Sequence, residues 1–156
     1  MYQKEFMDEA IRLANECFET GEGGPFGAVV VKDGQIVGRG RNMVTAYNDP
    51  TAHAEVMAIR DACRHLCDFQ LTGCDIYASS EPCPMCLGAI YWARPAHIYY
   101  GTPCETAAEA GFDDVLIYEE QGKPISEYSI ITEQHNTPEA EATFKRWRTF
   151  DKRIDY

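Results

Sequence analysis

The chain has 156 residues, of which 45% are hydrophobic and 25% charged, proportions that suit one globular domain with a sizeable core. Its 25 acidic residues outnumber its 14 basic residues, and the net charge is −11. This excess disfavours a nucleic-acid polymer as partner, because polyanion binding draws on Lys and Arg. No apolar run is long enough to span a membrane, and residues 1–5 do not resemble a signal peptide. We therefore expect one domain over residues 1–156, located in the cytoplasm and without a membrane partner.

The first third of the chain predicts a helix followed by a β-hairpin. Apolar residues recur at intervals of three and four over residues 5–20, and Gly21 follows where a helix end favours left-handed backbone. Residues 26–31 and 35–42 are typical of two strands joined by a turn at Asp33-Gly34. The hairpin delivers Asn42 to the end of its second strand. The Asn42 amide can either bind the edge of a base or cap a turn.

The middle of the chain alternates helices and strands. We predict a helix over residues 52–66, a short strand over 75–79, a helix opened by Pro82 and Pro84 that ends near Pro95, and a strand over 97–100. The apolar face expected for the first of these helices comprises Val56, Ile59, Cys63 and Leu66. This order predicts an α/β fold, a three-layer α/β/α sandwich around a central mixed sheet that the hairpin opens.

The last third of the chain is less regular. Residues 107–114 predict a short helical turn that ends at Gly111, with two carboxylates after it that suit a helix cap or a second acid/base. Residues 115–118 and 128–132 are apolar enough for either strand or packed helix. Residues 138–150 predict a final helix with Phe144 and Trp147 turned inwards.

Three residues have the types and spacing of zinc ligands. His53 is followed by Cys83 and Cys86, which are three positions apart. A tetrahedral zinc ion takes four ligands, and a catalytic site leaves the fourth position to water. Glu55, two residues after His53, supplies a carboxylate that can move the protons of that water. We therefore predict one zinc ion per chain with a bound water or hydroxide, and hydrolytic chemistry.

The alternative is a closed, purely structural zinc site, in which Glu55 is a charge on a helix surface. Such a site needs a fourth protein ligand from the remaining thiols and imidazoles: Cys63, Cys67, Cys74, Cys104, His65, His97 or His135. Dedicated structural sites usually show two closely spaced ligand pairs, which disfavours this interpretation. Seven cysteines fit a reducing compartment better than a disulfide framework. The five outside the metal site are then simply small buried side chains: Cys17, Cys63, Cys67, Cys74 and Cys104.

The spacing His-x-Glu followed by Pro-Cys-x-x-Cys resembles the signature of the zinc nucleobase deaminases. Four further stretches between residues 24 and 101 resemble the cytidine deaminase superfamily: residues 25–28, Asn42, residues 48–55 and residues 81–86. Over nearly the whole chain, the sequence is most similar to the short bacterial guanine deaminases of that superfamily. Two stretches and the last residue carry this narrower likeness: residues 87–95, residues 107–114 and Tyr156.

The resemblance implies a role for each matching residue. His53, Cys83 and Cys86 would bind zinc, Glu55 would shuttle protons, and Asp114 would act on the amine as a second acid/base. Four residues would contact the purine base: Asn42, Ala54, Phe26 and Tyr156. From packing alone, Phe26 is equally a core side chain.

The resemblance also implies a homodimer in which a C-terminal segment, about residues 138–156, is exchanged between subunits. The expected reaction is hydrolysis of guanine to xanthine and ammonia. Deamination of cytosine, of adenosine in tRNA or of another aminated heterocycle uses the same groups. A zinc-stabilised binding module without turnover is the alternative from a different class.

Overall fold

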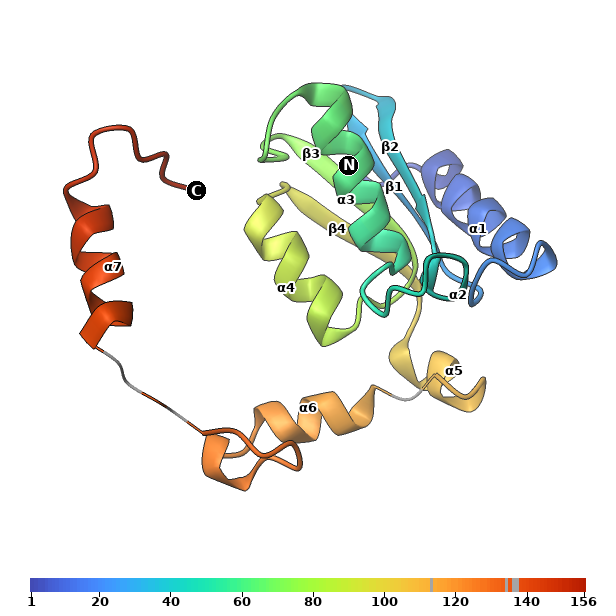
Figure 1. Cartoon of the computed structure of the whole chain (residues 1–156). Coiled ribbons are helices and arrows are strands. Elements are labelled where there is room, and N and C mark those ends of the chain that lie inside the picture. Colours follow the sequence, from blue (N-terminus) through green and yellow to red (C-terminus); the bar gives the residue numbers. More distant parts are fainter. Residues whose placement is uncertain (113, 134, 136–137) are drawn as a thin grey trace. The chain divides into compact units, whose positions relative to one another are not determined.

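The computed structural model describes residues 1–112, 114–133, 135 and 138–156, and it divides the chain into two units, Met1–Asp114 and Val115–Tyr156. The first unit contains a four-stranded sheet (Figure 1), formed by β1 (Gly27–Lys32), β2 (Gln35–Arg41), β3 (Cys74–Ser80) and β4 (His97–Thr102). The strands lie in the order β2-β1-β3-β4. β1 is antiparallel to both β2 and β3, whereas β3 and β4 are parallel. The predicted mixed sheet is therefore confirmed.

Helices cover both faces of this sheet. On one face lies α1 (Lys4–Glu19), and on the other lie α3 (Ala54–Leu66) and α4 (Pro84–Ala93) (Figure 1). Successive side chains of a strand point to opposite faces, and β1 shows the result. Val29 and Val31 join the core cluster that α1 forms, whereas Ala28 and Val30 join the cluster under α3 and α4. The three-layer α/β/α arrangement is the predicted one.

The turns form where the sequence predicts them. Asp33 has φ 50° and Gly34 has φ 74°, the pair of left-handed residues that a two-residue hairpin requires. α1 ends at Glu19, and Gly21 follows with φ 75°. The hairpin therefore ends β2 at Arg41, directly before Asn42 and the short helix α2 (Val44–Tyr47).

The buried face of α3 differs from the predicted one. Its most deeply buried apolar side chains are Ala54, Ala58 and Ala62. Gly40 of β2 lies so close to α3 that an added Cβ would be 2.0 Å from the Ala54 carbonyl oxygen. Only small residues fit such a contact. All four residues expected to face inwards are half-buried, and three of them pack against this core cluster: Ile59, Cys63 and Leu66.

The first unit ends with α5 (Cys104–Glu109), after which Gly111 has φ 93°. The second unit contains α6 (Val115–Gln121), a 3-10 turn η1 (Ile125–Glu127) and α7 (Pro138–Arg148). Residues 115–118 are thus helical, whereas 128–132 form neither helix nor strand. Phe144 is 72% exposed and Trp147 is 43% exposed, so the prediction that both turn inwards is wrong for the single chain.

All seven cysteines are free. Cys17 and Cys74 are buried as predicted, but Cys63 and Cys104 are half-buried and Cys67 is exposed. Cys67 follows the last residue of α3 and has left-handed backbone, which directs it away from the core. In the described parts of the chain, no helix is both long and apolar enough to cross a membrane.

Candidate metal centre

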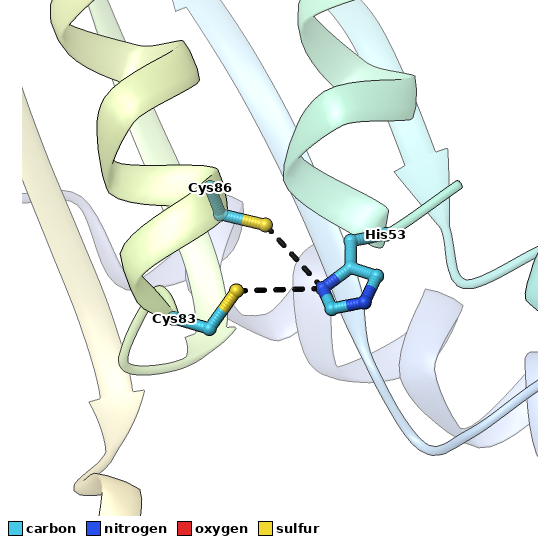
Figure 2. A group of neighbouring side chains, drawn as sticks. All are labelled: His53, Cys83 and Cys86. Carbon is cyan, nitrogen blue, oxygen red and sulfur yellow. Dashed lines mark hydrogen bonds between the residues drawn. The ribbon is translucent and has the colours of Figure 1, made fainter. Parts of the chain in front are cut away.

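His53, Cys83 and Cys86 form the predicted cluster, and their ligand atoms all lie within 4.8 Å of one another. Both sulfur atoms face the same ring nitrogen (Figure 2): Nδ1 of His53 is 3.6 Å from Sγ of Cys83 and 3.5 Å from Sγ of Cys86. With Zn–N and Zn–S bonds of about 2.1 and 2.3 Å, tetrahedral geometry separates ligand N and S atoms by roughly 3.6 Å. The three side chains are therefore spaced to hold one zinc ion.

Two helix starts present these ligands. His53 is the residue directly before α3, and Cys83 is the residue directly before α4, with Cys86 in the first turn of that helix. Pro84 opens α4, where its missing N–H costs no hydrogen bond. The N-terminal end of a helix stabilises negative charge, so this placement favours the thiolate form of the cysteines. The observed helix begins at Ala54, two residues later than the predicted start at residue 52, so His53 directly precedes it.

The three candidate ligands shift one another's pKa values. Hydrogen bonding with Cys86 lowers the pKa of Cys83 to about 4. The same bond, together with burial, raises the pKa of Cys86. The hydrogen bond with Cys83 raises the pKa of His53, and the nearby charges of Glu55 and Asp114 act in the same direction. The pair therefore holds a thiolate readily, which is the form that binds zinc.

Glu55 lies beside this cluster in the interior. It is only 7% exposed, and its Oε2 accepts a hydrogen bond of 3.4 Å from the Cys86 thiol. Burial raises the pKa of Glu55 above its ordinary value. A buried carboxyl group with a raised pKa, next to a metal centre, is suited to taking up and releasing protons. A charge on a helix surface would be exposed, so the surface interpretation of Glu55 does not describe this structure.

The structure brings Asn42, Phe26 and Ala54 to the same end of the sheet. The Asn42 backbone N–H donates to the Phe26 carbonyl at 3.1 Å, which extends the hairpin by one pair. The Met43 N–H donates to the carbonyl of Ala52 at 2.9 Å, which joins the residue after Asn42 to the residue before His53. Ala54 is the first residue of α3 and is fully buried. Asn42 itself is 6% exposed.

Of the two functions predicted for Asn42, the structure shows turn capping, and binding of a base stays a prediction. Its Oδ1 accepts a hydrogen bond of 3.2 Å from the backbone N–H of Val44, as a turn-capping Asn does. The amide NH2 group is then the part that faces away from Val44. Phe26 likewise packs against the core and stacks edge-on with Phe112, at 4.9 Å between ring centres.

The remaining predicted site residues lie later in the chain. Asp114 is the last residue of the first unit. Its negative charge contributes to the raised pKa of both His53 and Cys104. Asp113, its partner in the predicted carboxylate pair, lies outside the described residues. Tyr156 belongs to the second unit, and its role stays a prediction.

A fourth protein ligand for the metal is not found in the described parts of the chain, since no other His, Cys, Asp or Glu joins the cluster. Sequence reasoning missed two features near the site. Phe112 packs against both Phe26 and Gly24, and Gly23 lies directly against Asn42. The aromatic residue was part of the 107–114 motif, but nothing local connects Gly23 to a residue nearly twenty positions later.

Comparisons with known proteins agree with this site. Residues 1–102 match the cytidine and deoxycytidylate deaminase zinc-binding region. The chain is 52% identical to guanine deaminase of Bacillus subtilis over 156 residues, all of both chains. An X-ray structure of guanine deaminase from Bacillus subtilis superposes with a TM-score of 0.97 and covers 100% of this chain and 99% of that one.

More distant relatives match only part of the chain. The tRNA-specific adenosine deaminase of Aquifex aeolicus is 45% identical over 94 residues, 60% of this chain and 62% of that protein. A guanine deaminase structure from Nitrosomonas europaea has a TM-score of 0.69 at 27% identity, and covers 72% of this chain and 65% of that one. By its sequence and its metal-binding geometry, the chain belongs to the cytidine and deoxycytidylate deaminase family.

Proposed function

We propose that this protein is a zinc-dependent guanine deaminase that hydrolyses guanine to xanthine and ammonia. The observation that carries the proposal is the convergence of His53, Cys83 and Cys86 at 3.5–3.6 Å beside the buried carboxyl group of Glu55. Three ligands and an acid/base are what a hydrolytic zinc site requires.

The three ligands would hold one zinc ion per chain, and the ion would supply a water whose pKa is lowered towards neutrality. Glu55 accepts a proton from this water as the oxygen adds to the ring carbon that bears the amine. Glu55 then passes that proton to the adjacent ring nitrogen. The second proton comes from the hydroxyl group that the water has left on the ring carbon. Glu55 with Asp114 would carry it to the amine, which leaves as ammonia while the carbonyl of xanthine forms. Water and guanine thus balance xanthine and ammonia.

Substrate positioning is assigned to four residues on the basis of the resemblance. Asn42 would bind the purine edge with its amide, with Ala54 beside His53 at the floor. Phe26 and Tyr156 would cover the base. Closure of this kind excludes water other than the reacting one and orients the substrate, and both effects raise the rate of attack.

The choice of guanine over other bases is supported by the extent of the likeness. The guanine deaminase of Bacillus subtilis aligns with the whole chain, including everything after residue 102, whereas the tRNA-specific adenosine deaminase of Aquifex aeolicus aligns with 60% of it. The net charge of −11 also suits a small base better than tRNA, because RNA binding requires neutralisation of phosphates.

The test is ammonia release from guanine, cytosine, adenine, their nucleosides, GMP and a tRNA substrate. We expect turnover of guanine, with poor turnover of GMP. Fast deamination of GMP, or preference for another member of the panel, would reject the assignment to guanine. A protein that binds zinc and releases ammonia from none of them would be a binding module.

The metal content provides a separate test. We expect elemental analysis of the purified protein to return one zinc per chain. A protein without zinc, or a fourth protein ligand in place of water, would contradict the catalytic interpretation.

We further propose a homodimer in which the C-terminal segment is exchanged, so that Tyr156 of each chain completes the site of its partner. The support is that the second unit buries none of its described helical residues within the single chain. Apolar side chains left exposed in this way favour association with another surface.

A further inference from the structure

Asn42 is held from several sides. Its Oδ1 accepts from the Val44 N–H at 3.2 Å, and its backbone carbonyl accepts from the buried thiol of Cys17 at 2.8 Å. Its own N–H donates to the carbonyl of Phe26 at 3.1 Å. These contacts fix the backbone of Asn42 and select the orientation of its side-chain amide.

A further contact comes from the loop after α1. A Cβ added to Gly23 would lie 2.2 Å from the backbone oxygen of Asn42 and 2.4 Å from its Oδ1. These distances are far inside van der Waals contact, so only glycine fits here. The backbone of Gly23 therefore packs directly against the Asn42 amide, and a shift of the Gly23 backbone would move that amide.

The residue before Gly23 binds the residue before Asn42. The Arg41 guanidinium meets the Glu22 carboxylate with two atoms, Nε to Oε2 at 2.7 Å and Nη2 to Oε1 at 3.0 Å. Both side chains are about 30% exposed, at 30% and 29%. This two-pronged geometry orients both groups as well as attracting them. The carbonyl of Glu22 also accepts from the Ala46 N–H at 3.2 Å and from Thr45 Oγ1 at 2.8 Å.

Glu22 therefore binds the chain on both sides of Asn42, at Arg41 before it and at α2 after it. We propose that Arg41, Glu22 and Gly23 form a positioning clamp that sets the Asn42 amide for binding the purine base. The inference rests on the proposed function in one respect, since it takes Asn42 as a substrate-binding residue. The three residues act through Asn42 and do not touch the reacting atoms.

The chain contains a matched control for the clamp. Arg41 also pairs with Glu16 of α1, Nη1 to Oε1 at 2.9 Å. The control residue is Arg39, two positions earlier on β2 and on the same face, which pairs with a different acidic residue of α1. Its Nε is 2.9 Å from Oε1 of Glu9. Arg39 is 52% exposed and does not bind Glu22, so Arg39→Gln removes a similar ion pair away from Asn42.

Steady-state kinetics on full-length, zinc-loaded protein separate the two positions. We expect Arg41→Gln to raise KM for guanine about tenfold, the loss expected when one hydrogen bond of Asn42 is misaligned. The kcat should change less than about twofold, because uniform binding is lost while the zinc ligands and Glu55 stay in place. Arg39→Gln should leave KM unchanged. Equal KM values for the two variants would overturn the clamp.

A double-mutant cycle then asks whether Arg41 acts through Asn42. In the Asn42→Ala background, Arg41→Gln should raise KM no further. Gly23→Ala should reproduce the KM increase with Arg41 intact, because its methyl group displaces the Asn42 amide directly. A full additional increase in the Asn42→Ala background would assign Arg41 some other role.

A readout without turnover keeps this inference separate from the proposed function. In ¹⁵N-labelled protein, the side-chain NH2 signals of Asn42 are those that Asn42→Ala removes. We expect Arg41→Gln to shift these signals and Arg39→Gln to leave them in place. No shift with Arg41→Gln would overturn the clamp, whatever the substrate. If Arg41→Gln shifts the Asn42 signals but the wild-type protein releases no ammonia from guanine, only the proposed function would be overturned.

Discussion

Glu55 keeps a carboxyl group in the interior of the first unit, where the ionised form is costly. Burial raises its pKa, and the Cys86 thiol at 3.4 Å is its hydrogen-bond partner. A carboxyl group that both gains and loses a proton during one turnover needs a pKa closer to neutrality than that of an exposed Glu. Its position beside two ligand-bearing helix starts explains why this acidic residue can lie buried there.

Replacing Glu55 with glutamine tests its role as acid and base. Glu55→Gln should lower kcat for guanine by about 10² to 10⁴, because glutamine keeps the shape but cannot carry the proton. Zinc content should stay at the wild-type level, since the three ligands are unchanged. Glu5→Gln, on the exposed side of α1, serves as control. Substantial guanine turnover by Glu55→Gln would reject the role.

The candidate metal ligands were more predictable than the residues that contact Asn42. Zinc ligands are of few types and come at short spacings, so His53, Cys83 and Cys86 can be read from the sequence. The Arg41–Glu22 pair is an ordinary pair of charged residues, and the contact of Gly23 with Asn42 joins two loops. Contacts of this kind follow from the tertiary fold and have no local pattern.

At the level of elements, β2 lies very close to α3. A Cβ at Gly40 would lie 2.0 Å from the Ala54 oxygen and 2.3 Å from the Ala58 nitrogen, and both are backbone atoms that cannot rotate away. The glycine therefore sets the distance between strand and helix. Since His53 directly precedes this helix, the same contact helps to place a metal ligand.

Gly40→Ala should force α3 away from the sheet. We expect a loss of about 1–3 kcal/mol in the free energy of unfolding, the usual cost of overpacking, together with weaker zinc binding in a chelator competition. Gly88→Ala in α4 is the matched control, because an added Cβ there meets nothing within 4 Å. That change should leave zinc affinity unaltered and add up to about 1 kcal/mol of stability. Unchanged zinc affinity and stability in Gly40→Ala would contradict this account.

The pairing of α1 with β2 predicts a dependence of stability on pH. Hydrogen bonds from Arg12, and then from Arg39, lower the pKa of Glu9 to about 2. A carboxyl group with a lowered pKa in the folded state stabilises the protein above its unfolded value near 4.5, and this contribution is lost as pH falls towards 2. Because both arginines are more than half exposed, we discount the effect to about 1 kcal/mol.

Urea unfolding of wild type and Glu9→Gln measures this contribution. The variant should be less stable by about 1 kcal/mol at pH 7, and the difference should shrink below pH 4 and in high salt. A difference that stays constant down to pH 2 would show that the loss comes from packing and not from ionisation.

Helices and the hairpin were predictable because their signals are local. Residues with left-handed backbone at Asp33 and Gly34 and a proline at the start of α4 each mark a boundary. The alanine face of α3 was not predictable in the same way. Counting large apolar residues selected Ile59, Cys63 and Leu66, whereas the closeness of Gly40 depends on how two elements pack.

Over the whole molecule, the two units differ in how they use apolar residues. The first encloses two core clusters on the faces of its sheet. The second exposes most of its large apolar side chains: Val115, Leu116, Ile117, Tyr118, Ile125, Ile130, Ile131, Phe144, Trp147, Phe150, Ile154 and Tyr156. A segment of this length rarely forms its own core. The proposed association with a second subunit would cover Phe144 and Trp147, whose predicted inward orientation is missing from the single chain.

The tail provides the test of this association. Chain ends are usually frayed, so removal of residues 154–156 would ordinarily change nothing. If Tyr156 closes the pocket of the partner subunit over the base, the truncated protein should instead lose most of its guanine turnover and keep its zinc. A tail that acts within its own chain predicts the same loss, and a mixture of two inactive proteins separates these cases.

The mixture combines truncated chains that keep Glu55 with full-length Glu55→Gln chains. In a heterodimer with exchanged tails, one site has both an intact Glu55 and an intact Tyr156. Random exchange of equal amounts makes half of the dimers mixed, so roughly a quarter of the wild-type activity per chain should return. Co-purification through a tag on one chain verifies that subunits have exchanged. If mixed dimers form and the activity stays at the mean of the two separate proteins, each tail serves its own subunit or none, and the shared site is wrong.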